Sequence, residues 1–429
     1  RAWYAQAVQG FTEPDDQVRR LAAELTKGKS SREDKVRAIF DFVADDIRYV
    51  NYVSGEWWLP NRPQQLLARR EGDCDDKAML LITLLKSIGI TAQEVMVQTR
   101  ETAQPSILKA KNVAAPLFDH GIAFLPGISL PGTSSTAAGT YLDATSPQSR
   151  LGPLPSMDAR AVALKMDQGP AEIVDMPASS PADHGSKIKW LITLKADGSG
   201  DLSGEEEDVG DGAFWLRTNL TEEGARQEYV RDNLVGGYFA AVEVDKQIDF
   251  KGDLPGGRAW VKYKAHSGVM ARREDQDLVL PLSPSATMTS NLAPLVRRTL
   301  PVSLPPELAP SHQARTMTIE APAGYAWATL PAKGDVNGGE FGSAHLDVAR
   351  DPKNARAIIV TRNVTLDMSL IPVEKYAAWR GFLQQIDALM HKSVRLVRTN
   401  ELVKTTELVK TTELVKTTEL VKTQKAVTK

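Results

Sequence analysis

The stretch Glu71-Gly72-Asp73-Cys74-Asp75-Asp76-Lys77-Ala78, followed at once by the apolar run 79–85, decides the fold of this chain. We expect a helix from about residue 73 to residue 88, because Gly89 behind it favours a left-handed cap. Cys74, the only cysteine, then lies in the first turn of that helix. The helix dipole and the unpaired first-turn amides favour the thiolate there, which is the nucleophilic form of the side chain.

Helices are expected before this segment and strands after it. Ser31 with Asp34 resembles a capping box, and the apolar residues behind it repeat at helical spacing, which predicts a helix with one buried face. These residues are Val36, Ile39, Phe40 and Val43. Extended patterns predict strands at 47–50, 91–100, 118–125 and 140–143. A helix-rich start followed by strands indicates an α+β domain that ends near residue 155.

Two further residues could complete a nucleophilic site with Cys74. His120 shares one face of its predicted strand with apolar residues, and Asp143 lies at the end of the next strand. The plain interpretations are a satisfied core histidine and an Asx turn. The order Cys, His, Asp instead predicts a thiol, a base and an orienting carboxylate. Because Asp73, Asp75 and Asp76 oppose a thiolate, an imidazolium must lie closer to the sulfur than they do.

These residues match a known pattern. The segment 70–78, with the leucine pairs 80–81 and 84–85 and the Gly-Ile pair 89–90, resembles the cysteine motif of the transglutaminase-like superfamily. The histidine strand and the Asp-Ala-Thr strand end are similar to the second and third motifs of that family. The resemblance covers roughly residues 30–150. Many members have His-Ala-Trp at the histidine, whereas this chain has His-Gly-Ile at 120–122.

The resemblance implies a papain-like fold and assigns roles to the residues. Cys74 would be the nucleophile, His120 the base and Asp143 the orienting carboxylate. The backbone N–H of Cys74 would contribute to an oxyanion hole, with Tyr49 or Trp58 as candidates for the second donor.

We expect an α+β architecture in which a papain-like transglutaminase core, helices packed on an antiparallel sheet, precedes a β-sandwich-like domain and a C-terminal helix. Alternation in the later region predicts strands at 258–265, 314–321, 355–367 and around 345, and a helical insert is expected near 212–233. The predicted divisions are a catalytic domain at 1–155, a connector at 156–186, a β-sandwich-like domain at 187–370, a helix at 371–398 and a solvated hexapeptide-repeat tail at 399–429.

Composition excludes several classes of protein and site. The net charge of −2 among 429 residues gives no basic field for nucleic acid. No apolar run is long enough to span a bilayer. One cysteine excludes an internal disulfide framework and a multi-cysteine zinc site. The acidic run 73–76 lacks EF-hand spacing, and the acidic run 205–208 is expected to be a solvated strand edge. We therefore expect neither a metal nor a cofactor.

The sequence thus predicts thiol-dependent acyl transfer or hydrolysis at amide bonds of a peptide or protein, through a Cys74 thioester. The sequence does not decide whether water or an amine accepts the acyl group. The alternative is a non-catalytic cell-envelope binding or scaffold protein that uses the papain-like cleft. The resemblance implies a periplasmic or cell-envelope location. Since the chain begins with Arg1, we expect a trimmed product, with an upstream β-domain possible in the family and not visible here.

Overall fold

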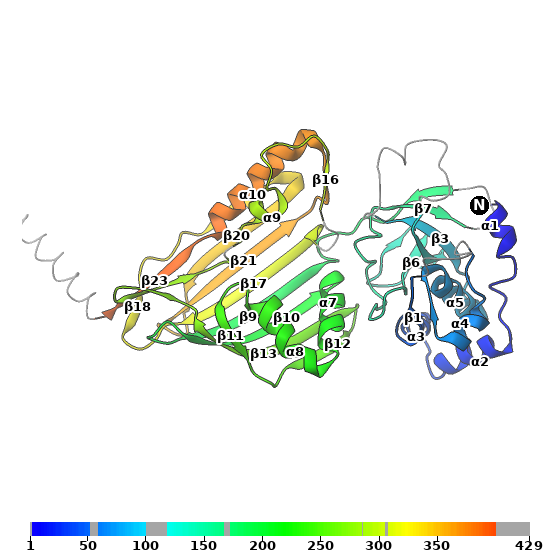
Figure 1. Ribbon diagram of the computed structural model, residues 1–429, viewed down its shortest axis with the longest axis horizontal. Coiled ribbons are helices and arrows are strands. Elements are labelled where there is room, and N and C mark those ends of the chain that lie inside the picture. The colour runs from blue at the N-terminus through cyan, green and yellow to red at the C-terminus, as the bar shows by residue number, and fades with distance from the viewer. Residues whose placement is uncertain are drawn as a thin grey trace, which may run out of the picture.

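The computed structural model describes residues 2–51, 59–99, 118–166, 172–284, 286–304 and 308–399. It shows an N-terminal domain of helices and a small sheet beside a second domain built on a large sheet (Figure 1). None of the helices within these ranges is long and apolar enough to cross a membrane. Trp58 and the repeat tail from residue 400 on lie outside the described residues.

Helices form the first part of the N-terminal domain, as the sequence predicts. The Ser31 hydroxyl caps its helix by accepting from the Asp34 amide at 3.0 Å, and the predicted apolar face behind it is buried. The central helix α5 is buried along most of its length, because the helices α2, α3 and α4 and the strand β4 surround it. The helices are α1 (Ala2–Ala7), α2 (Asp16–Leu25), α3 (Arg32–Asp46), α4 (Pro63–Arg69) and α5 (Cys74–Ser87).

An antiparallel sheet completes the domain, with strand order β5-β6-β4-β3-β7-β8. Its strands are β3 (Gln93–Gln98), β4 (His120–Pro126), β5 (Ser135–Thr136), β6 (Gly139–Leu142), β7 (Val162–Lys165) and β8 (Glu172–Asp175). The stretch 156–186, expected to be a connector, therefore gives two strands to this sheet, since β7 pairs with β3. Both are four residues long, and the Pro- and Gly-rich sequence around them obscures their alternation.

A two-stranded parallel ladder lies next to the start of α5. It joins β1 (Arg48–Tyr49) to β2 (Glu71–Gly72), with Tyr49 opposite Gly72. This pairing brings the end of the segment after α3 to the residues directly before Cys74.

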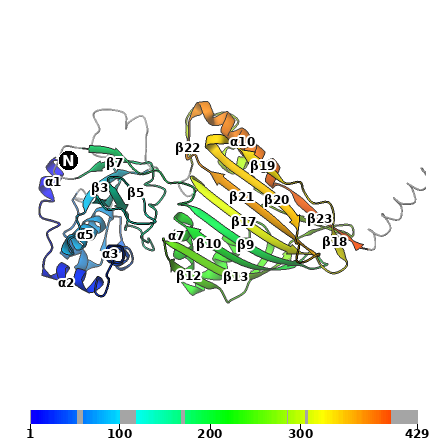
Figure 2. The ribbon, with the colours of Figure 1, turned by 180° about the vertical axis from the view of Figure 1, so that it is seen from behind.

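The second domain is built on a nine-stranded sheet. The strands predicted at 258–265, 314–321, 355–367 and around 345 are confirmed. The order is β11-β13-β10-β9-β17-β21-β20-β19, with β12 added on β13. Along β9 and β10, buried residues alternate with exposed or partly exposed ones, and Figure 2 shows the uncovered face of the sheet. The strands are β9 (Gly185–Leu194), β10 (Gly200–Val209), β11 (Ala240–Val244), β12 (Asp249–Leu254), β13 (Arg258–Val269), β17 (Ser311–Glu320), β19 (Gly334–Asn337), β20 (Gly342–Arg350) and β21 (Ala357–Leu366).

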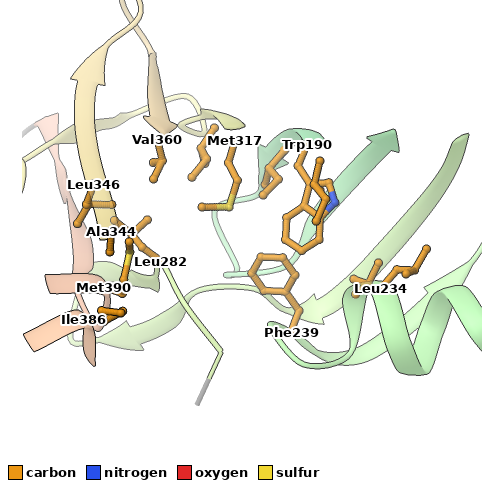
Figure 3. Packing of buried hydrophobic residues seen from close by; sticks show 14 of the residues in the cluster. Trp190, Leu234, Phe239, Leu282, Met317, Ala344, Leu346, Val360, Ile386 and Met390 are labelled. Carbon is orange, nitrogen blue, oxygen red and sulfur yellow. The ribbon is translucent and has the colours of Figure 1, made fainter. Parts of the chain in front are cut away.

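Helices and small sheets cover the other face of this large sheet. The helices are α7 (Asp211–Leu220), α8 (Arg226–Tyr229), the π-helix η3 (Val230–Val235), α9 (Met288–Leu292) and α10 (Tyr376–Met390), with 3-10 turns η2 (Glu223–Ala225), η5 (Gly339–Phe341) and η6 (Val373–Lys375). The small strands are β14 (Arg272–Glu274), β15 (Asp277–Pro281), β16 (Val302–Ser303), β18 (Tyr325–Trp327), β22 (Leu370–Ile371) and β23 (Ser393–Arg398). They enclose the apolar core drawn in Figure 3, where Trp190 of the sheet lies near Phe239 and Ala344 of the sheet lies near Met390.

Two predictions for this domain are wrong in detail. The helix expected at 371–398 ends at Met390, and Ser393–Arg398 is the strand β23, which pairs with β15 and β18. The acidic run 205–208 is not a solvated edge, because β10 is an inner strand between β9 and β13. Glu206 and Asp208 are 7% and 6% exposed, and both lie near Arg315, whose charge opposes the rise that burial causes in their pKa values.

Candidate active site

The start of α5 is built by two of its acidic residues. The Asp73 side chain accepts from the Asp76 amide at 3.0 Å, and the Asp76 side chain reaches back to the Asp73 amide at 3.4 Å. Asp76, 1% exposed, also accepts from the side chain of Asn61 at 2.9 Å. This reciprocal cap fixes the first turn, so Cys74 follows the cap with an amide that has no helical acceptor.

His120 and Asp143 come together across neighbouring strands. The β4–β6 register pairs Ala123 with Leu142, so Asp143 lies diagonally across from His120 on the same face. The Nε2 atom of His120 lies 3.2 Å from Asp143 Oδ2, and both residues are 5% exposed. Asp143 Oδ1 accepts from the Thr145 amide at 2.8 Å. Burial raises the pKa of Asp143, but the His120 ring and these hydrogen bonds outweigh burial and lower it to about 2.

The thiol of Cys74 completes the group. With Nε2 directed at Asp143, the other ring nitrogen of His120 is left for the thiol, and a hydrogen bond between Cys74 and His120 affects the pKa of both. The structure therefore brings all three predicted side chains together. This is the order needed for a base that takes a proton from sulfur while a carboxylate holds its far nitrogen.

The charges around the sulfur favour the thiol in the resting state. Burial raises the pKa of Cys74, the His120 hydrogen bond lowers it, and Asp75 raises it again. Asp75 Oδ1 lies 3.7 Å from the sulfur. Burial alone would lower the pKa of His120, but the carboxylate of Asp143 raises it well above its usual range. A thiol therefore rests beside an imidazolium, and loss of one proton from the pair generates the reactive form.

Asp75 also explains why a glycine follows the histidine. A Cβ atom on Gly121 would lie 2.0 Å from Asp75 Oδ1. The carboxylate thus occupies the space that the alanine of His-Ala-Trp would need. Gly121 thus leaves room for the carboxylate of the residue that directly follows Cys74.

Of the two oxyanion candidates, only Tyr49 is described. Tyr49 is 38% exposed in β1. Burial raises the pKa of its hydroxyl, and the charge of the Cys74 thiolate adds to that rise. Its place opposite Gly72 keeps it beside the helix start.

Sequence reasoning missed three buried ionisable residues around the site. Asp158 is 0% exposed behind Asp143, and no periodicity or spacing in its Pro- and Ser-rich segment indicated it. Glu94 on β3, 6% exposed, accepts from the Tyr4 hydroxyl at 2.8 Å. Burial raises its pKa well above the usual range, and Asp75 adds to that rise. Lys77 donates to the carbonyls of Ala44 and Ile47 at 3.2 and 2.8 Å. In the sequence, the burial of Lys77 is indicated only by its position next to the apolar run 79–85.

Ligand atoms of His120, Asp143 and Asp158 lie within 4.8 Å of one another, so this group has the donor set and spacing of a potential metal site. A pocket of about 160 Å³ lies where the domains meet, lined by Asp143, Arg150, Ser156, Phe214 and Trp215 among others. Cys74 and His120 do not line it, so it lies behind the orienting carboxylate and away from the sulfur.

Comparison with known proteins agrees with this geometry. Residues 19–121 match the model of the transglutaminase-like superfamily. The N-terminal domain belongs to this superfamily. Residues 277–396 match the model of a domain of unknown function with a solved structure, DUF3858. The transglutaminase-like domain is thus followed by a second recognised module within the large-sheet domain. No curated protein matches the chain.

One solved structure supports the fold of this chain. A proposed protease from Parabacteroides distasonis ATCC 8503 aligns with 92% of this chain at 12% identity, with a TM-score of 0.54. The chain spans 57% of the length of that protein. A proposed cysteine protease from Cytophaga hutchinsonii aligns with 39% of this chain and 51% of its own length at 18% identity, with a TM-score of 0.25. The first likeness shows that the transglutaminase-like domain and the large-sheet domain occur together in one fold.

Proposed function

We propose that the protein carries out thiol-dependent hydrolysis or acyl transfer at amide bonds of peptides or proteins, with Cys74 as nucleophile. The observation that carries this proposal is the contact series from the Cys74 thiol to the His120 ring to the Asp143 carboxylate, with 3.2 Å between the last two. A solitary buried cysteine would not need a histidine held in this way.

The reaction follows from the positions of the three groups. The resting pair first loses one proton to solvent, which leaves a thiolate beside the imidazolium of His120. The thiolate attacks the amide carbonyl, and the oxygen of the tetrahedral intermediate takes the negative charge. The Cys74 amide and the Tyr49 hydroxyl would donate to that oxygen. His120 then gives the proton to the leaving amine, the C–N bond breaks and a thioester remains. Water or a second amine attacks the thioester, and the thiol is restored.

The proposal is tested with a library of fluorogenic peptide amides and intact-mass detection of the acyl-enzyme. Cys74→Ala and His120→Ala should each lower kcat/KM roughly 10³-fold or more. His266→Ala is the matched control, because that histidine pairs with Asp201 on the second domain, 2.8 Å away. Turnover by Cys74→Ala at the wild-type rate would exclude the thiol mechanism.

The acyl acceptor is identified by measuring how the acyl group of the thioester divides between water and an added amine. With a primary amine present, a hydrolase should release mainly free acid, whereas a transglutaminase should release the new amide. The ratio of the two products, measured at several amine concentrations, decides between these two forms of the proposed function.

A further inference from the structure

A second carboxyl group, that of Asp158, lies behind the His120–Asp143 pair. Asp158 is 0% exposed, in the turn 156–160 between β6 and β7. One of its oxygens, one oxygen of Asp143 and one ring nitrogen of His120 all lie within 4.8 Å of one another. Two carboxyl groups this close in a dry site cannot both ionise without a large electrostatic cost.

The hydrogen-bond partners of the two carboxyl groups differ sharply. Asp143 has the Thr145 amide at 2.8 Å and the His120 ring at 3.2 Å. Among the described residues, no N–H or O–H group reaches either side-chain oxygen of Asp158. A buried carboxylate without donors is very unfavourable, whereas a protonated carboxyl group brings a donor of its own.

We propose that Asp158 is a positioning residue that retains a proton and directs it, as a hydrogen-bond donor, at the carboxylate of Asp143. The two carboxyl groups then carry one negative charge, which the imidazolium of His120 balances. Burial, reinforced by the charge of Asp143, raises the pKa of Asp158 well above its usual range, in agreement with this arrangement.

Asp158 acts on the reaction through Asp143. A third donor, added to Thr145 and His120, fixes the plane of the Asp143 carboxylate and reduces its basicity. The proton on His120 Nε2 therefore stays on the ring when the imidazolium forms, and the other ring nitrogen stays directed at the sulfur.

The turn that carries Asp158 is fixed by hydrogen bonds within the turn and by hydrogen bonds to the second domain. Within it, the Asp158 amide donates to the Pro155 carbonyl at 3.0 Å, and the Ala161 amide donates to the Asp158 carbonyl at 3.2 Å. From the second domain, the Asp211 side chain accepts from the Ser156 amide at 3.3 Å and from the Ser156 hydroxyl. The carboxyl group is thus held in place before any substrate binds.

The test is an NMR titration of His120 in the wild type, Asp158→Asn and Asp158→Ala. The His120→Ala protein assigns the resonance among six histidines. Asn keeps a neutral donor, so the His120 titration should not change in Asp158→Asn. The other charged or titratable neighbours of His120 (Tyr49 on β1, Cys74 and Asp75 on α5, Asp143 after β6) are the same in all three proteins.

Two results would overturn the proposal. An ionised Asp158 would lose its charge equally in both variants, and the pKa of His120 would fall by the same amount in Asn and Ala. A stoichiometric divalent metal in the purified protein, lost in Asp158→Asn, would show that the three side chains bind a cation and not a proton.

The effect on turnover rests on the proposed function. Ala should lower kcat roughly tenfold or more with KM unchanged, and Asn should restore most of the loss. If Asp158→Ala has the same kcat as the wild type, Asp158 does not position Asp143 for the reaction. A wild type without any activity would instead refute the proposed function, and the His120 titration would still test the shared proton. If Asp158→Ala does not fold, the Asn variant alone decides the titration.

Discussion

At the scale of single residues, Asp75 sets the reactivity of the thiol. Its carboxylate lies 3.7 Å from the Cys74 sulfur and raises the thiol pKa, and its own pKa is raised to about 6, mainly by burial. Above pH 6 the anion therefore opposes the thiolate, whereas below pH 6 it becomes neutral. Asp75 therefore lowers the fraction of Cys74 that is thiolate at every pH above about 6.

We expect Asp75→Asn to raise the rate of Cys74 alkylation by iodoacetamide roughly tenfold at pH 8. Removing a negative charge beside the sulfur favours the thiolate, while the amide keeps the shape of the side chain. Rates measured from pH 5 to pH 9 by intact mass should converge below pH 6, where Asp75 is protonated in the wild type. Equal rates at pH 8 would contradict this role.

Gly121 and Asp75 should be energetically coupled. A Cβ at position 121 would lie 2.0 Å from Asp75 Oδ1, so Gly121→Ala should cost about 1–3 kcal/mol of unfolding free energy. Asp75→Ala empties that space, so the double variant should recover at least about 1 kcal/mol relative to additivity. A urea-unfolding double-mutant cycle measures this term, and strict additivity would show that the two residues do not compete for space.

At the scale of elements, Lys77 joins the central helix to the end of α3. Its ammonium group is 0% exposed and donates to the carbonyls of Ala44 and Ile47, two groups at the C-terminus of α3. Burial lowers its pKa to about 8. The folded protein therefore releases this proton near pH 8, whereas the unfolded chain keeps it to about pH 10.4.

Because the unfolded state binds more protons between these values, the stability due to Lys77 rises with pH across the window. The wild type should gain about 3 kcal/mol over Lys77→Met between pH 8 and pH 10.5. Urea titrations at several pH values measure the difference. Lys86→Met, on the same helix with its side chain 44% exposed, is the control and should show no such trend.

Local signals explain which elements could be predicted. The cap and the apolar period around Cys74 act within one helix. Long strands of the large sheet such as β9 and β20 alternate over ten and nine residues. The short strands β7 and β8 lack that length. The strand β23 was missed because apolar spacing continues beyond Met390, although the helix ends there.

Some residues of the site can likewise be predicted from local sequence signals, and others cannot. The order of Cys74, His120 and Asp143 is visible in the chain. The register of β4 and β6 brings His120 and Asp143 together, and the packing of α5 against β4 adds Cys74. Asp158 reaches the site through a turn outside any periodic element, so its burial is a product of tertiary structure. Trp58 lies outside the described residues, and its role stays a prediction.

At the scale of the whole molecule, Arg217 joins the two domains. It belongs to α7 and is 4% exposed. Its Nε donates to the Gln148 carbonyl of the transglutaminase-like domain at 2.6 Å. Its Nη1 donates to the carbonyls of Gly257 and Gly252 in the second domain at 3.0 and 3.2 Å. One guanidinium thus supplies donors to both domains at the edge of the junction pocket.

Arg217→Ala should lower the unfolding free energy by about 3 kcal/mol, because it leaves buried carbonyls without donors. It should also separate the unfolding of the two domains, since the loop that follows Asp143 loses its anchor on α7. Calorimetry and urea unfolding measure both effects. Arg231→Ala removes an exposed arginine that pairs with Asp232 on the same domain, and its unfolding midpoint should stay at the wild-type value. If both variants unfold alike, the junction does not depend on Arg217, and the two domains must be held together by their remaining contacts, such as the Arg150 side chain with Asp253.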